Sequence, residues 1–304
     1  MKIRIATRLS PLAILQTKEV IKKIQHHEPT CICEIIKIKS DGDQTDMPLH
    51  VIGGKGLFVS KLEQALCNQI ADIAVHSLKD VPASLDKKFT IAATLPREEV
   101  EDVLLLRDKL KISDLSKKLK IATSGPRRKA QLLGINSGFN IVPIRGNIQT
   151  RIDKMTTEKL DGLVVAKAAL NRLKISYPNI YIFSEEEMLP AAAQGAIGIE
   201  VIKENIETKT NNLLESINDN LTFQATEIER TVVKALQGNC LSPISALCKI
   251  KEGKHRSTFK HKTSYADSFD LEVILRPRFG ILSVISLEIL IFCNGYISKI
   301  IFAR

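Results

Sequence analysis

The sequence predicts an α/β protein built from two or three domains. The chain has 304 residues, 44% of them hydrophobic, so it can bury more than one packed core. Short apolar runs alternate with helix-like segments up to about residue 95 and again from residue 120, which is typical of parallel sheets covered by helices. A proline and charged residues at 96–99 separate the two units and indicate a crossover between domains.

The first unit opens on a strand and a capped helix. Ser10 is placed as the N-cap of this helix and Pro11 as its first residue. The connection at residues 40–56 is long, polar and rich in glycine, so it is either a functional lid or a disordered loop. We expect, in order, a strand at 3–6, a helix at 11–26, a strand at 31–39, a helix from about 57 with Phe58, Leu62, Ala65, Leu66 and Ile70 on its packed face, and a strand at 73–75.

The second unit repeats this alternation and then returns toward the first. A small-residue hinge at 189–195 precedes a strand at 196–201, which would carry the chain back. Two helices follow, at 204–217 and 220–236, and Gly238 ends the second near a C-cap position. The expected elements before the hinge are strands at 91–95 and 102–107, a strand at 120–122, a helix at 127–135, a strand at 140–144, a helix at 147–158 and a strand at 162–166.

The formal net charge of +10 favours an anionic partner, which could be nucleic acid, a membrane surface or a small polycarboxylate. Because the chain has no tryptophan and only 5% aromatic residues, it lacks stacking platforms for single strands, and it shows no RNA-recognition or zinc-finger motif. Nucleic acid is therefore not expected. The apolar stretch at 281–292 is interrupted and too short for a membrane span, so we expect strands or a helix there and no membrane partner.

The cysteines and the N-terminus predict a cytoplasmic protein. The N-terminus runs directly into a strand and shows no apolar signal core, so the six cysteines are interpreted as reduced thiols. Cys31 and Cys33 form a C-x-C pair on an alternating strand without nearby histidines, so no metal site is expected.

The strand at 73–75 ends in a polar cluster that contains His76, Ser77, Lys79 and Asp80, and Pro82 prevents further pairing. Ligands of open α/β sheets bind at the carboxyl ends of strands, so Lys79 and Asp80 are site candidates. Taken alone, a strand cap with a solvated ion pair explains the stretch equally well.

Arginines recur where predicted strands meet helices. Arg8 and Ser10 follow the first strand, and Arg127 and Arg128 occupy a first helical turn, where the helix dipole disfavours cations unless an anion binds. The next junction between a strand and a helix contains Arg145 and Arg151, and the helix after it contains Arg172. A solvated helix face explains any one of them, but bidentate recognition of carboxylates explains the set better. Residues 53–56 (GGKG) lack the full phosphate-loop pattern, so a nucleotide site is not expected.

Five motifs in one order resemble the porphobilinogen deaminase family: ATRLSPLA at 6–13, GGKGLF at 53–58, ADIAVHSLKDVP at 71–82, RGN at 145–147 and GNC at 238–240. The resemblance covers about residues 2–250. It implies an α/β fold with two periplasmic-binding-protein-like (type II) domains and a third, smaller α/β domain. The implied domains are 1–95 plus 196–217, 100–189, and 218–304.

The resemblance implies a transferase of porphyrin and heme biosynthesis. The family joins four porphobilinogen molecules, with loss of ammonia at each step, to form the linear tetrapyrrole hydroxymethylbilane. Its primer is a dipyrromethane cofactor bound by a thioether to a cysteine, which by motif position is Cys240. The expected protein is a monomer with a small-molecule substrate. The alternative is an inactive or divergent homologue that only binds an anionic small molecule.

The same motif positions imply the site residues. Asp80 matches the catalytic carboxylate, which can stabilise the cationic azafulvene that forms when ammonia leaves. Cofactor contacts are implied for Cys240, Lys79, Arg127, Arg128, Thr123, Ser124, Arg145 and Gly146. Substrate contacts are implied for Arg8, Ser10, Arg145, Arg151, Arg172, Lys55 and Phe58, with Lys55 on the lid before Phe58, while Gln194 and Gly195 match the hinge motif.

The chain departs from the family pattern in three places. Gly125-Pro126 stands where the family commonly has Ser-Leu, which removes a hydroxyl contact but preserves a helix start. Ala192-Ala193 replaces the usual Pro-Gly of the hinge, so the backbone geometry there is in question. Residues 251–304 match the family poorly, which puts in question how the third domain folds and supports Cys240.

Overall fold

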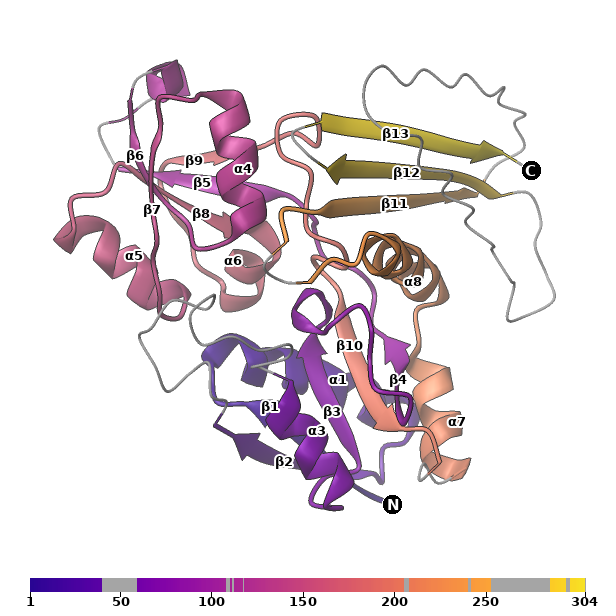
Figure 1. Cartoon of the computed structure of the whole chain (residues 1–304). Coiled ribbons are helices and arrows are strands. Elements are labelled where there is room, and N and C mark those ends of the chain that lie inside the picture. Colours follow the sequence, from indigo (N-terminus) through magenta and orange to yellow (C-terminus); the bar gives the residue numbers. More distant parts are fainter. Residues whose placement is uncertain are drawn as a thin grey trace.

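The computed structural model describes residues 1–39, 59–107, 110, 112–116, 118–204, 208–239, 242–252, 285–293 and 296–303. These residues form two five-stranded sheets and one three-stranded sheet. Figure 1 shows the two larger sheets as separate α/β lobes, with the smaller sheet lying beside them. We call these parts lobe 1, lobe 2 and the third sheet.

Lobe 1 contains the sheet β2-β1-β3-β10-β4. β1 runs parallel to β2 and β3, so the carboxyl ends of β1 and β3 meet at one edge, where Arg8 and Ser77 end the two strands. This edge carries the polar residues that stand out in the sequence. The elements are β1 (Lys2–Arg8), α1 (Pro11–His27), β2 (Ile32–Ile38), α3 (Ser60–Cys67), β3 (Ile73–Ser77), β4 (Phe89–Thr94), β10 (Ile197–Ile202) and α7 (Thr208–Ile217).

The central strands of the sheet in lobe 1 are buried on both faces because helices cover each of them, whereas the edge strand β2 is partly exposed. On one face Ile3 and Ile5 pack into a core with Val20 and Ile24 of α1. On the other face Ala6 joins a second core built on Leu62, Ala65, Leu66, Ala71, Ala74 and Phe89. Alternate residues of a strand point to opposite faces, so two covered faces require the nearly continuous apolar runs seen in the sequence.

Lobe 2 contains the sheet β7-β6-β8-β5-β9. β6 is parallel to β7 and β8, whereas β5 is antiparallel to β8 and β9. The sequence pattern did not predict β9, a three-residue strand at the edge of the sheet. The elements are β5 (Asp102–Leu106), β6 (Lys120–Ala122), α4 (Pro126–Ile135), β7 (Asn140–Val142), α5 (Ile148–Thr157), β8 (Gly162–Ala166), α6 (Lys167–Leu173) and β9 (Ile180–Ile182).

The chain crosses between the lobes twice. β5 follows β4 of lobe 1 directly, and β10 follows β9 of lobe 2 and returns to lobe 1 between β3 and β4. Each crossing strand enters its new sheet antiparallel to a neighbour. This order, repeated in both lobes, is that of type II periplasmic-binding-protein-like domains, and it confirms the predicted fold class.

The third sheet has the order β11-β12-β13 and packs on α8 (Asn220–Ala235). Its strands are β11 (Ser245–Glu252), β12 (Ile285–Cys293) and β13 (Tyr296–Ala303), all antiparallel. In Figure 1 α8 lies under this sheet and beside β10 and β4 of lobe 1. The apolar stretch predicted as strands or a helix therefore contains a strand. No helix in the described ranges is long and apolar enough to cross a membrane.

The hinge segment, residues 189–195, keeps a left-handed backbone despite its alanines. Ala193 has φ 59°, and its amide donates to Glu229 Oε2 of α8 at 2.6 Å. Glu229 is fully buried and also binds both terminal nitrogens of Arg97 at 2.7 and 3.0 Å and the amide of Cys248 at 2.9 Å. One carboxylate thus joins both crossings to the third sheet.

One detail of the expected helix before β3 is wrong. α3 ends at Cys67, Gln69 then takes a left-handed φ of 55°, and Ile70 is 49% exposed instead of packed. The helical spacing continued in the sequence beyond the point where the chain turns. The expected lid at 40–56, with Leu57 and Phe58, lies outside the described residues.

Candidate active site at the ends of β1 and β3

A small cavity of about 60 Å³ lies at the sheet edge where β1 and β3 end. Asp80 sits in the single 3₁₀ turn, Leu78–Asp80, that follows β3, and Arg8 is the last residue of β1. Ser10 caps α1, since its Oγ accepts from the amide of Ala13 at 3.2 Å. The structure therefore brings together three residues predicted separately from the sequence. The lining residues are Arg8, Ser10, Leu12, Ala13, Gln16, Val59, Val75, His76, Ser77 and Asp80.

Lys79 points from the same turn toward the hinge. Its side chain is half-buried, and Nζ donates to Gln194 Oε1 at 3.1 Å. Burial lowers the pKa of Lys79 to about 8, and repulsion from Arg128 and Arg127 adds to the effect, whereas Asp80 and Asp102 oppose it. The ammonium is therefore easier to deprotonate than that of an ordinary lysine.

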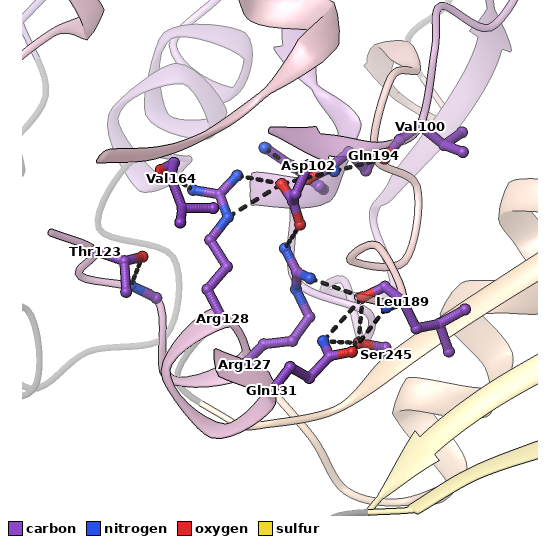
Figure 2. Close-up of polar contacts among 12 residues, drawn as sticks. Val100, Asp102, Thr123, Arg127, Arg128, Gln131, Val164, Leu189, Gln194 and Ser245 are labelled. Carbon is purple, nitrogen blue, oxygen red and sulfur yellow. Dashed lines mark hydrogen bonds and ion pairs between the residues drawn. The ribbon is translucent and has the colours of Figure 1, made fainter. Parts of the chain in front are cut away.

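Arg127 and Arg128 meet on one buried carboxylate that no sequence motif indicated (Figure 2). Arg127 donates to Asp102 Oδ2 at 2.6 Å, and Arg128 donates to Oδ1 through Nε at 3.1 Å and a terminal nitrogen at 2.7 Å. Arg127 also donates to the carbonyl of Leu189 at 2.7 Å, and Arg128 to that of Val164 at 3.3 Å. Asp102 offsets the cations that crowd the first turn of α4.

Asp102 remains ionised despite having no exposed surface. Burial alone would raise its pKa, but the charges of Arg127 and Arg128, with a smaller contribution from Lys79, hold the pKa well below its usual range. The signal in the sequence was an aspartate at the start of the otherwise apolar strand 102–106. Only the fold shows what it binds.

The charges around the site affect the pKa of Arg151. Its Nε donates to the carbonyl of Gly146 at 2.7 Å. The pKa of Arg151 is lowered to about 10, mainly by burial and also by three nearby cations, whereas Asp80 raises it. Those three cations are Arg128, Arg145 and Arg8. Arginines from both lobes thus act on the same region as Asp80.

Other predicted residues serve the local backbone in this structure. Ser124 Oγ donates to the carbonyl of Ile144 and accepts from its amide at 2.9 Å, and Thr123 Oγ1 accepts from the amide of Gly125 at 3.4 Å. Gly146 has φ +115°, and a Cβ there would lie 2.7 Å from Cγ2 of Thr150, so only glycine fits.

Arg172 of lobe 2 lies against both the hinge and lobe 1. It donates to the carbonyl of Gly195 at 2.9 Å, and its Nε lies 3.4 Å from Glu19 Oε1 of α1. Three further predicted residues, Lys55, Phe58 and Cys240, lie outside the described residues.

The fold and the site together define a class: a two-lobed α/β protein of type II topology in which Asp80 lies near several arginines at the ends of the strands. Residues 3–210 match the family model described as porphobilinogen deaminase, dipyromethane cofactor binding domain. The chain belongs to the porphobilinogen deaminase family.

Curated relatives agree with this assignment. Porphobilinogen deaminase of Clostridium botulinum (strain 657 / Type Ba4) is 43% identical over 82% of this chain and 84% of that protein. The protein of the same name from Clostridium acetobutylicum is 42% identical over 84% of this chain and 86% of that relative. The one from Alkaliphilus metalliredigens is 36% identical over 91% of this chain and 85% of that relative. The crystal structure described as that of the probable amino-acid ABC transporter extracellular-binding protein ytmK from Bacillus subtilis aligns over 71% of this chain and 90% of its own chain at 14% identity, with a TM-score of 0.42.

Proposed function

We propose that this protein joins four porphobilinogen molecules head to tail, with release of ammonia at each step, to form hydroxymethylbilane. The observation that carries the proposal is the position of Asp80, in a cavity at the ends of β1 and β3 with Arg8 and Ser10. Losing ammonia leaves a cation on the substrate, and a carboxylate held there stabilises that charge and can accept or return a proton.

The cations around Asp80 suit the rest of the substrate. Each porphobilinogen carries an acetate and a propionate, so the growing chain accumulates negative charge. Guanidinium groups bind carboxylates bidentately, and those buried at a site bind them more strongly than in water. We assign carboxylate binding to Arg8, Arg145, Arg151 and Arg172 and to the ammonium groups of Lys79 and Lys55, with Lys55 on the lid. Ser10 and Phe58 would contact the substrate without contributing a charge.

The residues present also suit a dipyrromethane cofactor attached through Cys240. Its carboxylates match a donor set of lysine, arginine and backbone amides, which Lys79, Arg128 and the turn at Thr123 and Gly146 supply. When bound, the cofactor provides the pyrrole ring that accepts the first substrate unit. Arg127 and Ser124 would support this set, because their described bonds hold the carboxylate of Asp102 and the backbone of Ile144.

We further propose a cytoplasmic monomer. The described cysteines Cys31, Cys33, Cys67 and Cys248 are free thiols, as expected in a reducing compartment. Burial raises the pKa of Cys33 and of Cys248 to about 12, so neither favours a thiolate.

The test combines an assay with intact-mass measurement. Freshly purified protein is expected to release ammonia from porphobilinogen and to carry a covalent mass increase of two pyrrole units. Cys240→Ser should lose both, whereas Cys67→Ser, which changes an exposed thiol of α3, should keep both. An unmodified Cys240 in active protein would refute the cofactor assignment, and tight carboxylate binding without ammonia release would favour the binding-module alternative.

The N-terminus of α4 provides a second test. Gly125 is the N-cap and makes no side-chain cap bond, and a Cβ there would meet nothing nearer than 3.9 Å. Gly125→Ser is expected to stabilise the protein by a few tenths of a kcal/mol. The restored hydroxyl should also lower the KM for porphobilinogen by about fivefold, the effect of one ordinary hydrogen bond.

Gly134→Ser is the matched control for Gly125→Ser. It adds the same hydroxymethyl group to the same helix, where a Cβ meets nothing within 4 Å. We expect a change in thermal stability without a change in KM. Equal KM values for the two variants would contradict the hydroxyl contact.

A further inference from the structure

Gln194 of the hinge segment is fully buried and binds groups from both lobes. Its Oε1 accepts from Lys79 Nζ of lobe 1 at 3.1 Å. Its Nε2 donates to Asp102 Oδ1 of lobe 2 at 3.1 Å and to the carbonyl of Val100 on the first crossing at 2.6 Å. Its own carbonyl accepts from Arg97 Nε at 2.8 Å. Every polar atom of the side chain is thus engaged.

The chemistry of these contacts requires an amide. Lys79 offers only donors and Asp102 only acceptors, so the bridging side chain must accept at one end and donate at the other. A glutamate would set a second carboxylate beside Asp102, and a lysine or arginine would face the ammonium of Lys79. A neutral amide satisfies both neighbours without adding a charge between them.

Figure 2 shows that Asp102 continues the chain of contacts from Gln194 to Arg127 and Arg128. A hydrogen-bonded path therefore runs from the turn that carries Asp80, through the hinge, to the first turn of α4. The path joins two cations, Lys79 and Arg128, through one amide and one carboxylate. These bonds hold the two cations in a defined relative position.

We propose that Gln194 is a positioning residue that holds the ammonium of Lys79 in register with the Asp102–Arg128 pair, so that a carboxylate-bearing ligand meets prealigned cations from both lobes. This inference rests on the proposed function for the identity of the ligand, but the coupling itself is a property of the free protein. Gln194 acts through Lys79 and need not touch the reacting atoms.

The charge state of Lys79 is the quantity that this coupling controls. Four groups act on the ammonium: Arg128 and Arg127 disfavour it, and Asp80 and Asp102 favour it. Since the pKa of Lys79 is near 8, the loss of one hydrogen bond to the charged form changes its protonation within an accessible pH range.

The direct test measures how readily Lys79 reacts with acetic anhydride as a function of pH, read by peptide mass. The wild-type midpoint is expected near pH 8, the pKa of Lys79. Gln194→Met keeps the size of the side chain but removes the acceptor, so its midpoint should fall by about one pH unit. Gln194→Glu places a carboxylate at the ammonium, and its midpoint should rise by at least about one unit.

The control is Gln131→Met, the same replacement at another buried glutamine, which binds Leu189 and Ser245 and does not contact Lys79. It should lose stability but keep the wild-type midpoint. Identical midpoints in all four proteins would overturn the proposal and leave Gln194 a structural role only. If Gln194→Met does not fold, the upward shift in Gln194→Glu decides.

A kinetic readout then separates this proposal from the proposed function. In Gln194→Met, the KM for porphobilinogen relative to wild type should rise about fivefold more at pH 8 than at pH 6, because a midpoint of about 7 leaves about a tenth of Lys79 charged at pH 8, against about half in wild type. If the wild-type protein releases no ammonia, the proposed function is refuted. The acetylation midpoints would still test whether Gln194 positions Lys79. Normal turnover with unshifted midpoints would sink only the role of Gln194.

Discussion

Asp80→Asn is expected to lower the rate of ammonia release from porphobilinogen by roughly 100-fold or more, the range seen when a positioned acid–base or charge-stabilising group is removed. The amide keeps the shape of the carboxylate but neither offsets a developing cation nor exchanges a proton. Because Asp80 lines the cavity and lies on a short turn rather than in a core, the fold should survive. Initial rates and circular dichroism measure the two effects.

Asp86→Asn is the matched control for Asp80→Asn. Asp86 lies six residues further along the same connection, is exposed, and accepts from the amide of Lys88 at 3.1 Å. We expect turnover within about twofold of wild type, since surface substitutions rarely perturb a site. Near-normal turnover in Asp80→Asn would refute the catalytic assignment, and equal losses in the two variants would point to damage of the loop instead.

Asp102→Asn is expected to be the most destabilising of the proposed substitutions. Removing one partner of a buried ion pair leaves an uncompensated charge and costs about 3–5 kcal/mol. Here two buried guanidiniums lose their shared carboxylate, and the new amide hydrogens face the N–H groups of Arg127 and Arg128. Denaturant unfolding should show a lower midpoint. Glu34→Gln, which breaks the exposed pair with Lys2, should change stability by less than about 1 kcal/mol.

The dependence of the free energy of unfolding on pH in the acid range provides a second test of the Asp102 carboxylate. The pKa of Asp102 is lower in the folded protein than in the unfolded chain, so its contribution is full above the unfolded pKa, near 4, and is lost as pH falls through the folded pKa. The stability gap between wild type and Asp102→Asn should therefore narrow progressively below about pH 4. A gap that stays constant from about pH 7 to about pH 3 would contradict the ion-pair explanation.

Local sequence predicted the parts of this protein that depend on near neighbours. Ser10 and Pro11 start α1 as expected, Gly125 and Pro126 start α4, and the apolar run before His76 forms β3. Parallel strands share an edge at their carboxyl ends, and Arg8, Ser10 and Asp80 all follow such ends. Their chain positions alone therefore indicate that the three side chains lie near one another, as they do around the cavity.

The sequence could not supply contacts between residues distant in the chain. No strand was expected from the sequence at 180–182 or 296–303, where β9 and β13 form. The end of α3 depended on a left-handed turn at Gln69 rather than on the spacing of apolar residues. Likewise, the left-handed backbone at Ala193 is held by Glu229, which lies 36 residues away.

By itself, the sequence determined the α/β class, the family and the carboxylate at the end of β3. Each of these is recognised from short segments of neighbouring residues, whose backbone and side-chain preferences are local. Only the tertiary structure decided what the arginines bind. Asp102 joins Arg127 and Arg128 from 25 and 26 residues away, and Gln194 reaches Lys79 across 115 residues. Such pairs form because the two crossings between the lobes bring β5 and the hinge segment together. The spacing of residues along the chain does not predict these contacts.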